Sequence, residues 1–253
     1  MNGKPLISVI TVVYNGSGYI ESTIKSVINQ SYPHLEYIII DGASADGTQD
    51  ILQKYQKNLS YWISEPDQGI YDAMNKGLKM SHGDYVTFLN CGDSFYDRDI
   101  LFKVFNQPEA DVYYGETMLT DRKGIDLGTR SQLSSRKLPE RLTYKSFLKG
   151  MVVSHQALIV RRAIAPLYDL RYRCSADINW CITVLKRSHL NIKTDGMIVR
   201  YLTQGFSMRN RKRCWIERFR IFVIHFGIWR AFLSHIFISA RYFYYLITRR
   251  PNY

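Results

Sequence analysis

The chain has 253 residues, of which 46% are hydrophobic and 22% charged, and its formal net charge is +12. This composition excludes an intrinsically disordered chain and suffices for one domain of catalytic size. No metal-ligand spacing relates its four cysteines, Cys91, Cys174, Cys181 and Cys214. The first residues lack the apolar segment of an export signal. We therefore expect reduced thiols, neither zinc nor disulfides, and a cytoplasmic protein.

Short apolar, β-branched runs alternate with segments of helical periodicity through the first half of the chain. The runs predict strands over residues 6–13, 35–40, 61–64, 85–90 and 110–114. The periodic segments predict helices over residues 17–30, 46–57, 69–80 and 99–105. Alternation of this kind is typical of βαβ units. The predicted fold class is α/β, with a mixed, mainly parallel central sheet.

The second half is less regular. Residues 121–139 are polar and contain two glycines, which predicts loops over the sheet where a lid or acceptor cover would lie. Beyond them, a strand is expected over 157–160, a helix over 177–187 and a strand over 192–201. These pieces fit a mixed sheet with an added edge.

The last part of the chain is basic and aromatic. From Arg209 onward ten Lys and Arg stand against the single acid Glu217, so this part carries 10 − 1 = +9 of the net charge. Its uncharged stretches, 221–229 and 231–240, are shorter than the ~18 to 20 apolar residues that span a bilayer. One helix over 219–246 would gather its arginines in an arc of about 80° and leave a broad apolar face.

Two interpretations of this amphipathic tail remain open. A basic helix with aromatic residues is typical of the membrane interface, where arginines reach anionic head groups. Alternatively, the apolar face packs on the protein itself or on a second copy. We favour an anionic membrane surface as the partner of the tail.

Two aspartates close buried apolar runs. Asp41 follows the run 37–40, and Asp93 follows residues 86–92. A carboxylate at the carboxyl end of a parallel strand faces the crevice where open α/β sheets bind ligands. The pair predicts a nucleotide site with a metal, although both positions also suit ordinary turns.

Several ordered motifs together resemble bacterial family 2 glycosyltransferases of the GT-A fold, and look closest to the branch that makes colanic acid and other surface polysaccharides. They are residues 11–15 (TVVYN), 41–48 (DGASADGT), 65–77 (EPDQGIYDAMNKG), 83–85 (GDY), 90–93 (NCGD), 154–157 (SHQA) and 175–177 (SAD). The resemblance covers roughly residues 5–207. It implies a single Rossmann-like GT-A catalytic domain over 1–207, followed by a helical tail over 208–253.

The resemblance also implies a reaction. A sugar would move from a UDP- or GDP-linked donor to a lipid-linked glycan acceptor, with inversion and with Mn²⁺ or Mg²⁺ as the divalent cation. Asp93 would hold the metal, and the chain departs here from the commoner family pattern, because Gly92 replaces the first of two adjacent acids. One carboxylate can suffice, since donor phosphates supply further oxygen ligands.

Further roles follow by resemblance. The nucleotide sugar would be bound by Thr11, Tyr14, Asn15, Asp41, Asp72, Asn75 and Gly92. The acceptor or substrate would contact His155, Gln156, Gly205 and Ser207. Asp177 would be the catalytic base. From the residues alone, Asp72 and Asn75 equally suit helix capping, Asp177 an acid at a helix start, and His155 a satisfied polar residue.

Other functions are less well supported. A catalytically weakened nucleotide-sugar-binding scaffold of an assembly complex has only the Gly92 departure in its favour. Nucleic-acid binding would use the basic tail, but the acidic strand ends oppose it, so no nucleic-acid partner is expected. No Gly-x-Gly-x-x-Gly follows the first strand, which disfavours a dinucleotide-dependent oxidoreductase. The predicted location is the inner face of the cell membrane, with peripheral attachment.

Overall fold

The computed structural model describes residues 3–203 and 211–248. Within them a nine-stranded sheet has the order β3-β2-β1-β4-β8-β6-β9-β5, and β7 pairs with β6 beside this path. The strands are β1 (Ile7–Val13), β2 (Leu35–Asp41), β3 (Tyr61–Ser64), β4 (Tyr85–Phe88), β5 (Ser94–Phe95), β6 (Val112–Thr120), β7 (Asp126–Thr129), β8 (Leu158–Arg161) and β9 (Asn191–Leu202).

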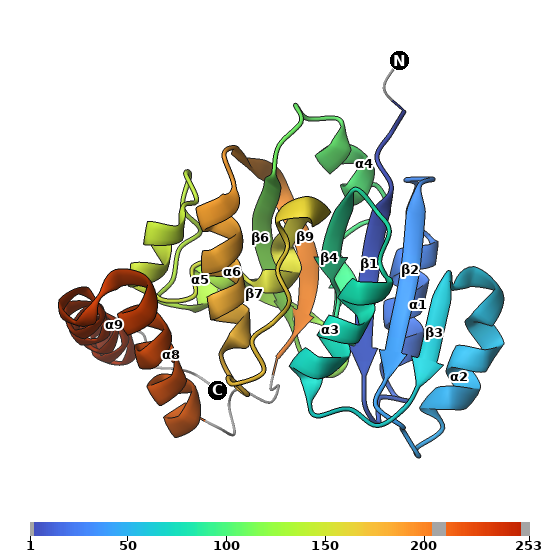
Figure 1. The fold of residues 1–253 in the computed structure, drawn as a ribbon, viewed down its shortest axis with the longest axis horizontal. Helices are drawn as coiled ribbons and strands as arrows, with labels where there is room; N and C mark the ends of the chain where they lie inside the picture. The colour runs from blue at the N-terminus through green and yellow to red at the C-terminus, as the bar shows by residue number, and fades with distance from the viewer. Residues whose placement is uncertain (1–2, 204–210, 249–253) are drawn as a thin grey trace.

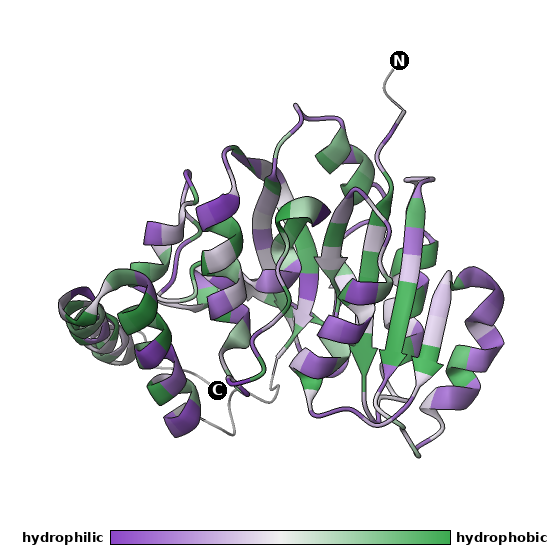
Figure 2. Ribbon diagram, in the orientation of Figure 1, coloured by the Kyte–Doolittle hydropathy of each residue, from purple (hydrophilic) through white to green (hydrophobic). Residues whose placement is uncertain are grey.

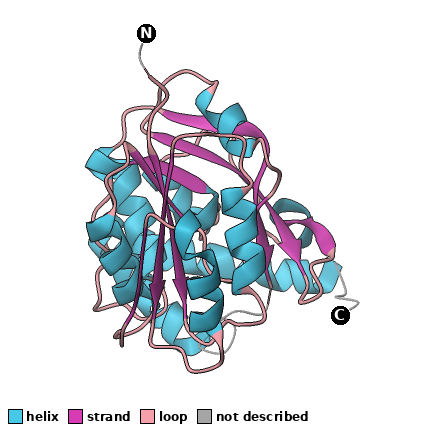
Figure 3. Ribbon diagram, turned by 90° about the vertical axis from the view of Figure 1, so that its right-hand side faces the viewer, coloured by secondary structure: helices cyan, strands magenta, loops and turns pink. Residues whose placement is uncertain are grey.

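Helices lie on both faces of this sheet (Figures 1 and 3). They are α1 (Ile20–Ile28), α2 (Thr48–Tyr55), α3 (Ile70–Met80), α4 (Ile100–Phe105), α5 (Arg130–Leu133), α6 (Ala176–Arg187), α8 (Arg211–Phe226) and α9 (Ile228–Thr248). The 3₁₀ turns are η1 (Gln56–Asn58), η2 (Tyr144–Lys149), η3 (His155–Ala157) and η4 (Arg162–Ile164).

The sheet is mixed and mostly parallel, as the sequence predicts. Strands β1 to β4 pair in parallel, and β9 is parallel to β6. Antiparallel β8 separates β4 from β6, so β6 and β9 run in the direction of β1. The carboxyl ends of these strands therefore meet at one edge of the sheet, the lower edge in Figure 1.

The strands next to the site are hydrophobic because helices cover both of their faces. Every residue of β1 is buried, and Ile38, Ile39 and Ile40 of β2 are fully buried. Figure 2 shows the hydrophobic residues concentrated in these central strands. Helix α3 covers the face seen in Figure 1, and Gly77 permits a close approach, since a Cβ there would lie 2.4 Å from Ile10 Cγ2.

Helix α6 is held against the sheet by aromatic packing. The Trp180 ring stacks on Tyr168 with centroids 5.3 Å apart and meets Phe88 of β4 edge to face at 5.6 Å. Its indole Nε1 donates to the Pro166 carbonyl at 2.7 Å. These contacts fix the start of α6, and with it Asp177, relative to the end of β4.

Some predicted boundaries are wrong for identifiable reasons. Helix α2 begins at Thr48, because Gly47 has a φ of 93° that an α-helix cannot contain. The strand expected over 110–114 continues as β6 to Thr120 through its pairing with β9. Residues 121–139 are not only loops, since they contain β7 and α5.

The expected C-terminal amphipathic helices are present as two helices, α8 and α9, and not as one continuous helix over 219–246. Gly227 adopts a φ of 84° and ends α8, and α9 then turns back against it. Ile221, Phe222 and Ala231 are fully buried in this hairpin and its contact with the body. None of the helices in the described residues is long and apolar enough to cross a membrane.

Candidate functional site

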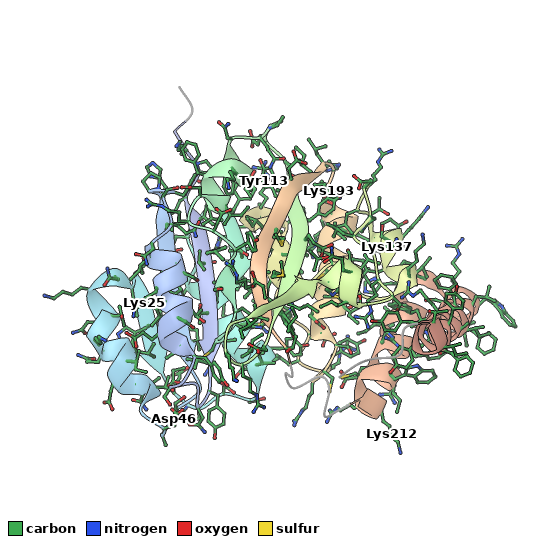
Figure 4. The ribbon with its side chains drawn as sticks, turned by 180° about the vertical axis from the view of Figure 1, so that it is seen from behind. Lys25, Asp46, Tyr113, Lys137, Lys193 and Lys212 are labelled. Carbon is green, nitrogen blue, oxygen red and sulfur yellow. The ribbon has the colours of Figure 1, made fainter. Side chains whose placement is uncertain are left out.

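The loops that follow β1 and β2 are tied together at the lower edge of the sheet. Asn15 has a φ of 49°, and its backbone N–H donates to Ser44 Oγ at 2.7 Å. Its side-chain Oδ1 accepts from the Ala45 N–H at 3.0 Å. Asp46, which Figure 4 labels at this edge, accepts from the Ser17 N–H at 2.9 Å. Because each loop supplies partners to the other, they form one rigid wall.

Asp41 lies at the base of this wall, fully buried at the end of β2. Oδ2 accepts from the Ser44 N–H at 3.0 Å and from Ser64 Oγ at 2.5 Å, and Oδ1 accepts from Ser44 Oγ. Three protein donors therefore compensate the buried carboxylate. The predicted position of Asp41 at a strand end is confirmed. Hydrogen bonds through Ser44 connect its buried carboxylate to the exposed residue Asn15.

Tyr14 is an exposed member of the predicted nucleotide-binding residues, with 68% of its surface accessible. It lies beside Gly42, because a Cβ built on Gly42 would be 3.3 Å from Tyr14 Cδ2 and 2.6 Å from Asp67 Oδ2. The ring therefore stands over the Asp41 loop. An exposed aromatic ring beside a carboxylate-bearing loop suits a nucleobase, which stacks and hydrogen-bonds at its edge.

Three other predicted nucleotide-binding residues are placed differently. Thr11 is fully buried and shares a hydrogen bond of 3.1 Å with the Tyr37 hydroxyl, so it belongs to the core and not to the crevice. Asp72 accepts from the Gln68 N–H at 3.0 Å, as a helix-start acid does. Asn75 does not lie on a polar face, because it is buried and binds both backbone groups of Tyr168, at 2.9 and 2.7 Å.

Gly92 is required by its backbone. It has a φ of 95°, and a Cβ at this position would lie 2.7 Å from Leu202 Cδ2. Its N–H donates to Thr23 Oγ1 at 3.0 Å, and Thr23 donates onward to the Asp93 carbonyl at 2.8 Å. A larger residue would meet both a strained backbone and a steric clash.

Asp93 is 3% exposed and has no cationic partner within ion-pair distance among the described residues. Oδ1 accepts from the Leu202 N–H and Oδ2 from Gln156 Nε2, each at 3.0 Å. Burial raises the pKa of Asp93 to about 7, which shows that these two donors do not fully compensate its charge.

A hard divalent cation fits this carboxylate. Each oxygen of Asp93 uses one lone pair for a protein donor and keeps others. No group of three His, Cys, Asp or Glu side chains in the described part of the chain could hold a metal by itself. A cation at Asp93 would therefore take its remaining ligands from phosphates and water, as Mg²⁺ commonly does.

Asp177, in the first turn of α6, is the second uncompensated carboxylate. Oδ1 accepts from the Tyr71 hydroxyl at 3.2 Å and from the Ile178 N–H at 2.9 Å. Its surroundings are deep within the molecule, yet 22% of the side chain remains exposed. Burial raises the pKa of Asp177 to about 6. The group is thus accessible, mostly ionised at neutral pH and basic enough to accept a proton.

His155 and Gln156 connect the two aspartates. In η3 the adjacent side chains diverge, so that Gln156 binds Asp93 while His155 Nδ1 lies 3.7 Å from Asp177 Oδ2. Burial lowers the pKa of His155 to about 4, so at neutral pH this contact joins a neutral ring to a carboxylate and is not an ion pair. His155 Nε2 is buried with no hydrogen-bond partner among the described residues.

Three contributors to the site have only weak sequence signals. Tyr71 directly precedes Asp72, the acid that the motif 65–77 makes a candidate. The hydrogen-bond partner of Tyr71, Asp177, is 106 residues away in the sequence. Cys91 lies between the two halves of the site, and burial together with the charges of Asp93, Asp46 and Asp41 raises its thiol pKa to about 12. The third is Glu217, the single acid of the tail.

Glu217 in α8 braces the segment that precedes Asp177. Its carboxylate accepts from the backbone N–H groups of Arg173, Cys174 and Ser175 at 3.1, 2.8 and 3.1 Å. Arg213 Nε adds a fourth bond at 2.9 Å. Although burial opposes it, these bonds lower the pKa of Glu217. The tail is therefore part of the support of the site.

The predicted residues Gly205 and Ser207 lie outside the described residues. Apart from Thr11, Asp72 and Asn75, the other predicted residues form two groups. Tyr14, Asn15 and Asp41 make up the first, and the second consists of Gly92, Asp93, His155, Gln156 and Asp177. A separate groove of about 860 Å³ lies away from both aspartates, between α8 and residues 171–172, and its lining is mainly apolar.

Sequence comparison identifies relatives of the whole domain. A sequence model described as "Glycosyl transferase family 2" matches residues 8–167. TuaG of Bacillus subtilis, provisionally named a teichuronic acid biosynthesis glycosyltransferase, is 31% identical over 220 residues, covering 83% of this chain and 84% of TuaG. A PGL/p-HBAD biosynthesis glycosyltransferase of Mycobacterium bovis is 30% identical over 184 residues, covering 68% of this chain and 67% of the relative.

Solved structures share the fold. S. aureus TarS 1–349 in complex with UDP-GlcNAc matches with a TM-score of 0.69 and 16% identity, covering 98% of this chain and 74% of that one. The mannosyltransferase PcManGT of Pyrobaculum calidifontis, in complex with GDP-Man and Mn²⁺, matches with a TM-score of 0.64 and 15% identity, covering 94% and 76%. They confirm the GT-A-like α/β fold, whereas the relatives' names do not specify the colanic acid branch. The chain belongs to glycosyl transferase family 2.

Proposed function

We propose that this glycosyltransferase is inverting and metal-dependent, and that it transfers a sugar from a UDP- or GDP-linked donor to a lipid-linked glycan acceptor during surface polysaccharide biosynthesis. The observation that carries the proposal is the connection of two desolvated carboxylates, Asp93 and Asp177, through Gln156 and His155. One carboxylate suits a metal and the other a proton. Such a division of roles is expected where two acids act in one transfer.

The donor would lie across the carboxyl ends of β1, β2 and β4. Tyr14, Asn15 and the Asp41 loop would receive the nucleoside, and Asp93 would face the diphosphate. A cation bound by Asp93 would neutralise the charge that grows on the leaving diphosphate. TarS and PcManGT were solved with UDP-GlcNAc and with GDP-Man, which supports a nucleotide sugar in this crevice.

Asp177 would act as the base. Its carboxylate removes the proton of the acceptor hydroxyl while that oxygen attacks the anomeric carbon from the face opposite the diphosphate. The bond between that carbon and the diphosphate oxygen breaks, and the configuration inverts. Tyr71 and the Ile178 N–H hold Oδ1, which leaves Oδ2 for the acceptor proton.

His155 and Gln156 would position these two groups and line the acceptor side. The neutral His155 ring excludes water from one side of Asp177, and its unpartnered Nε2 offers a hydrogen bond to a substrate hydroxyl. Gln156 holds Asp93 in place. The roles predicted for Gly205, Ser207 and Asn75 remain predictions, and the contacts of Thr11 do not support one in binding.

The helices α8 and α9 would place the enzyme on the inner face of the cell membrane. Their outer surface carries exposed large apolar side chains, Trp215, Ile216, Ile224, Ile228, Trp229, Phe232, Leu233, Ile236, Phe237, Tyr242, Phe243, Tyr244 and Ile247. Aromatic and aliphatic residues among arginines suit the headgroup boundary of an anionic bilayer. The inner surface of the same helices packs on the body of the protein. The tail would therefore both pack on the protein and bind the membrane surface.

Calorimetric titration of UDP and GDP, each with Mn²⁺ and with chelator, tests the donor site. We expect one nucleotide to bind in the presence of Mn²⁺ and the Asp93→Asn variant to lose this dependence. Asp195→Asn, a change at an exposed position in β9, is the matched control. Absence of binding by either nucleotide to the folded protein would favour the scaffold alternative. The presence of glycine at position 92 does not by itself support that alternative, because the backbone conformation there explains it.

A further inference from the structure

Four arginines converge beside Asp177, between the body of the protein and the C-terminal helices. Arg130 belongs to α5, Arg136 follows it, Arg218 lies in α8 and Arg241 lies in α9. All four are half-buried. Figure 4 labels Lys137, the neighbour of Arg136, on the side of the molecule that carries α8 and α9. Two parts of the chain that are distant in sequence, residues 130–136 and the C-terminal helices, thus bring cationic side chains to one region.

Backbone contacts define the walls of this region. Tyr245 of α9 donates to the Leu133 carbonyl at 2.8 Å, and Arg241 Nη2 donates to the Lys149 carbonyl at 2.7 Å. Arg130 Nη2 donates to the Met151 carbonyl. Helix α9 is therefore joined to both α5 and the end of η2, and α5 is joined to the segment after η2. These bonds hold the guanidinium groups in place without neutralising them.

Arg136 repels Arg130 and Arg218, and Arg241 repels Arg136 and Arg218. Glu116 and Asp177 offset part of this repulsion at Arg130, although neither is in ion-pair contact with it. Burial, followed by the charge of Arg136, lowers the pKa of Arg130 to about 10 and that of Arg218 to about 10. Burial and the charge of Arg241 lower the pKa of Arg136. None of the four forms an ion pair with a carboxylate in the described residues, and residues 204–210 contain no Asp or Glu.

The guanidinium groups also retain unused donors. Arg136 makes no side-chain hydrogen bond within the described residues. Arg241 Nε is buried without a partner among those residues. Burying several like charges and leaving their donors unpaired is costly, and a bound anion removes both costs. Arginine forks match the oxygens of phosphate groups.

The position of the cluster indicates which anion it would bind. The charge of Asp177 acts on both Arg130 and Arg136, so the cluster lies within electrostatic range of the proposed base. Arg130 and Arg241 bind the carbonyls of Met151 and Lys149, in the segment that leads to His155. Arg241 also lies over the Phe237 ring, 5.4 Å from its centroid, and so borders the apolar surface of α9. A phosphoryl group attached to a lipid chain would place its charge at the cluster and its chain along α9.

We propose that Arg130, Arg136, Arg218 and Arg241 form a binding site for the phosphoryl group of a lipid-linked acceptor, an inference that rests on the proposed glycosyl transfer. The site is built from other residues than the donor diphosphate position proposed at Asp93. It restricts the acceptor to a glycan whose attacked hydroxyl lies close to its lipid phosphate. The enzyme would then add a sugar near the start of a lipid-linked chain.

Calorimetric titration of inorganic pyrophosphate into the full chain, with chelator present, tests the site without requiring transfer. We expect the unaltered protein to bind and Arg136→Gln to weaken binding at least tenfold. Arg122→Gln, a change at an exposed arginine outside the cluster, should leave the affinity unchanged. Lack of binding by the unaltered protein, or equal binding by Arg136→Gln, would overturn the proposal.

Two controls separate this site from the donor site and from a structural role. Mn²⁺-dependent binding of UDP or GDP should be unchanged in Arg136→Gln, and its loss would assign the cluster to the donor. The melting temperature of Arg136→Gln without ligand should equal or exceed that of the unaltered protein, because a repelling charge is removed. A lower melting temperature would mean that the guanidinium is structural and would contradict the proposal.

Vesicle sedimentation identifies the source of the phosphate. Phosphatidylcholine vesicles with phosphatidic acid present a phosphate monoester, and vesicles with phosphatidylglycerol at equal surface charge do not. Arg136→Gln should weaken binding to the first more than to the second. An equal effect, or none, would exclude a lipid phosphate as the ligand. If pyrophosphate binds through the cluster but no donor supports transfer, the proposed function fails while the anion site stands.

Discussion

Gln156 donates from Nε2 to Asp93 Oδ2 over 3.0 Å, and Nδ1 of the adjacent His155 lies 3.7 Å from Asp177 Oδ2. A single 3₁₀ turn thus contacts both buried acids of the candidate site. The sequence predicts that both residues contact the acceptor or substrate. Their contacts also suit the positioning of the proposed metal-binding acid and the proposed base.

Replacing Asp177 by Asn should abolish sugar transfer while nucleotide binding persists. An amide has nearly the same shape but cannot take up a proton, and general-base catalysis contributes about 10²- to 10⁴-fold. Steady-state transfer and calorimetry with the preferred nucleotide measure the two effects. Asp195→Asn, at an exposed position, should alter neither. Transfer by Asp177→Asn at the rate of the unaltered protein would remove the base assignment.

The rate of transfer should depend on pH through Asp177. The base acts when deprotonated, so kcat/KM should rise with pH through a midpoint at about 6, the raised pKa of this carboxyl, and become level at higher pH. Tyr71→Phe removes a hydrogen bond that favours the charged form, which should move the midpoint upward by about 1 pH unit. The variant should thus be impaired at about pH 7 and below, and nearly normal at high pH.

A pH profile for Tyr19→Phe, a change at an exposed tyrosine, serves as the control and should match that of the unaltered protein. A Tyr71→Phe profile that is lowered equally at every pH would show that this hydroxyl acts on something other than the ionisation of Asp177.

Restoring a second acid at Gly92 should not strengthen metal binding. Gly92→Asp and Gly92→Ala place a Cβ at a φ of 95° and 2.7 Å from Leu202 Cδ2, so we expect a loss of about 1 to 3 kcal/mol of stability. Gly124→Ala has a similar positive φ in open space and should cost less. Denaturant titration measures all three. If the Gly92→Asp variant were as stable as the unaltered protein and bound Mn²⁺ more tightly, the prediction would be wrong.

Asn75 should prove structural. Asn75→Ala leaves both backbone groups of Tyr168 without partners in a buried position, and we expect a loss of about 2 to 4 kcal/mol in the free energy of unfolding. Nucleotide affinity should stay unchanged in the folded fraction. Asp72→Ala loses one helix-start bond and should cost about 0.5 to 2 kcal/mol. Weakened nucleotide binding with normal stability would restore the donor-binding role of Asn75.

The outer surface of α9 should bind anionic vesicles. Trp229 is 78% exposed, and its replacement by Glu should weaken sedimentation with phosphatidylglycerol vesicles by about tenfold, because burial of a large apolar side chain is lost. Ile125→Glu also replaces an exposed apolar side chain by Glu, at a position outside the C-terminal helices, and should have no effect. Equal binding by both variants would assign the exposed surface to a protein partner.

The sequence predicts the first half of the fold well because local pattern and environment agree there. Buried parallel strands such as 35–40 are continuous apolar runs, and the acids that end them, Asp41 and Asp93, lie where the predicted topology puts them. The extension of β6 depends on pairing with β9, some 80 residues later, and no local pattern reports it.

The sequence motifs predict the acids of the candidate site. They do not predict the hydrogen-bond partners of these acids, which come from other elements of the fold. Tyr71 lies on the buried face of α3 and resembles a core residue until α6 brings Asp177 to it. Arg130 and Arg136 stand in a polar stretch that resembles a loop. Gly227 sits inside a helical pattern that tolerates glycine, and only its φ of 84° shows that the tail folds back.

The hydrogen bonds from the segment before Asp177 to Glu217 mean that the C-terminal helices cannot be replaced independently of the rest of the chain. A chain that ended at residue 207 would leave the N–H groups of Arg173, Cys174 and Ser175 without their acceptor. Recombination that exchanged the last 46 residues for another amphipathic segment would have to bring a carboxylate to the same place. The basic, aromatic end of this chain and the segment before Asp177 are therefore structurally interdependent.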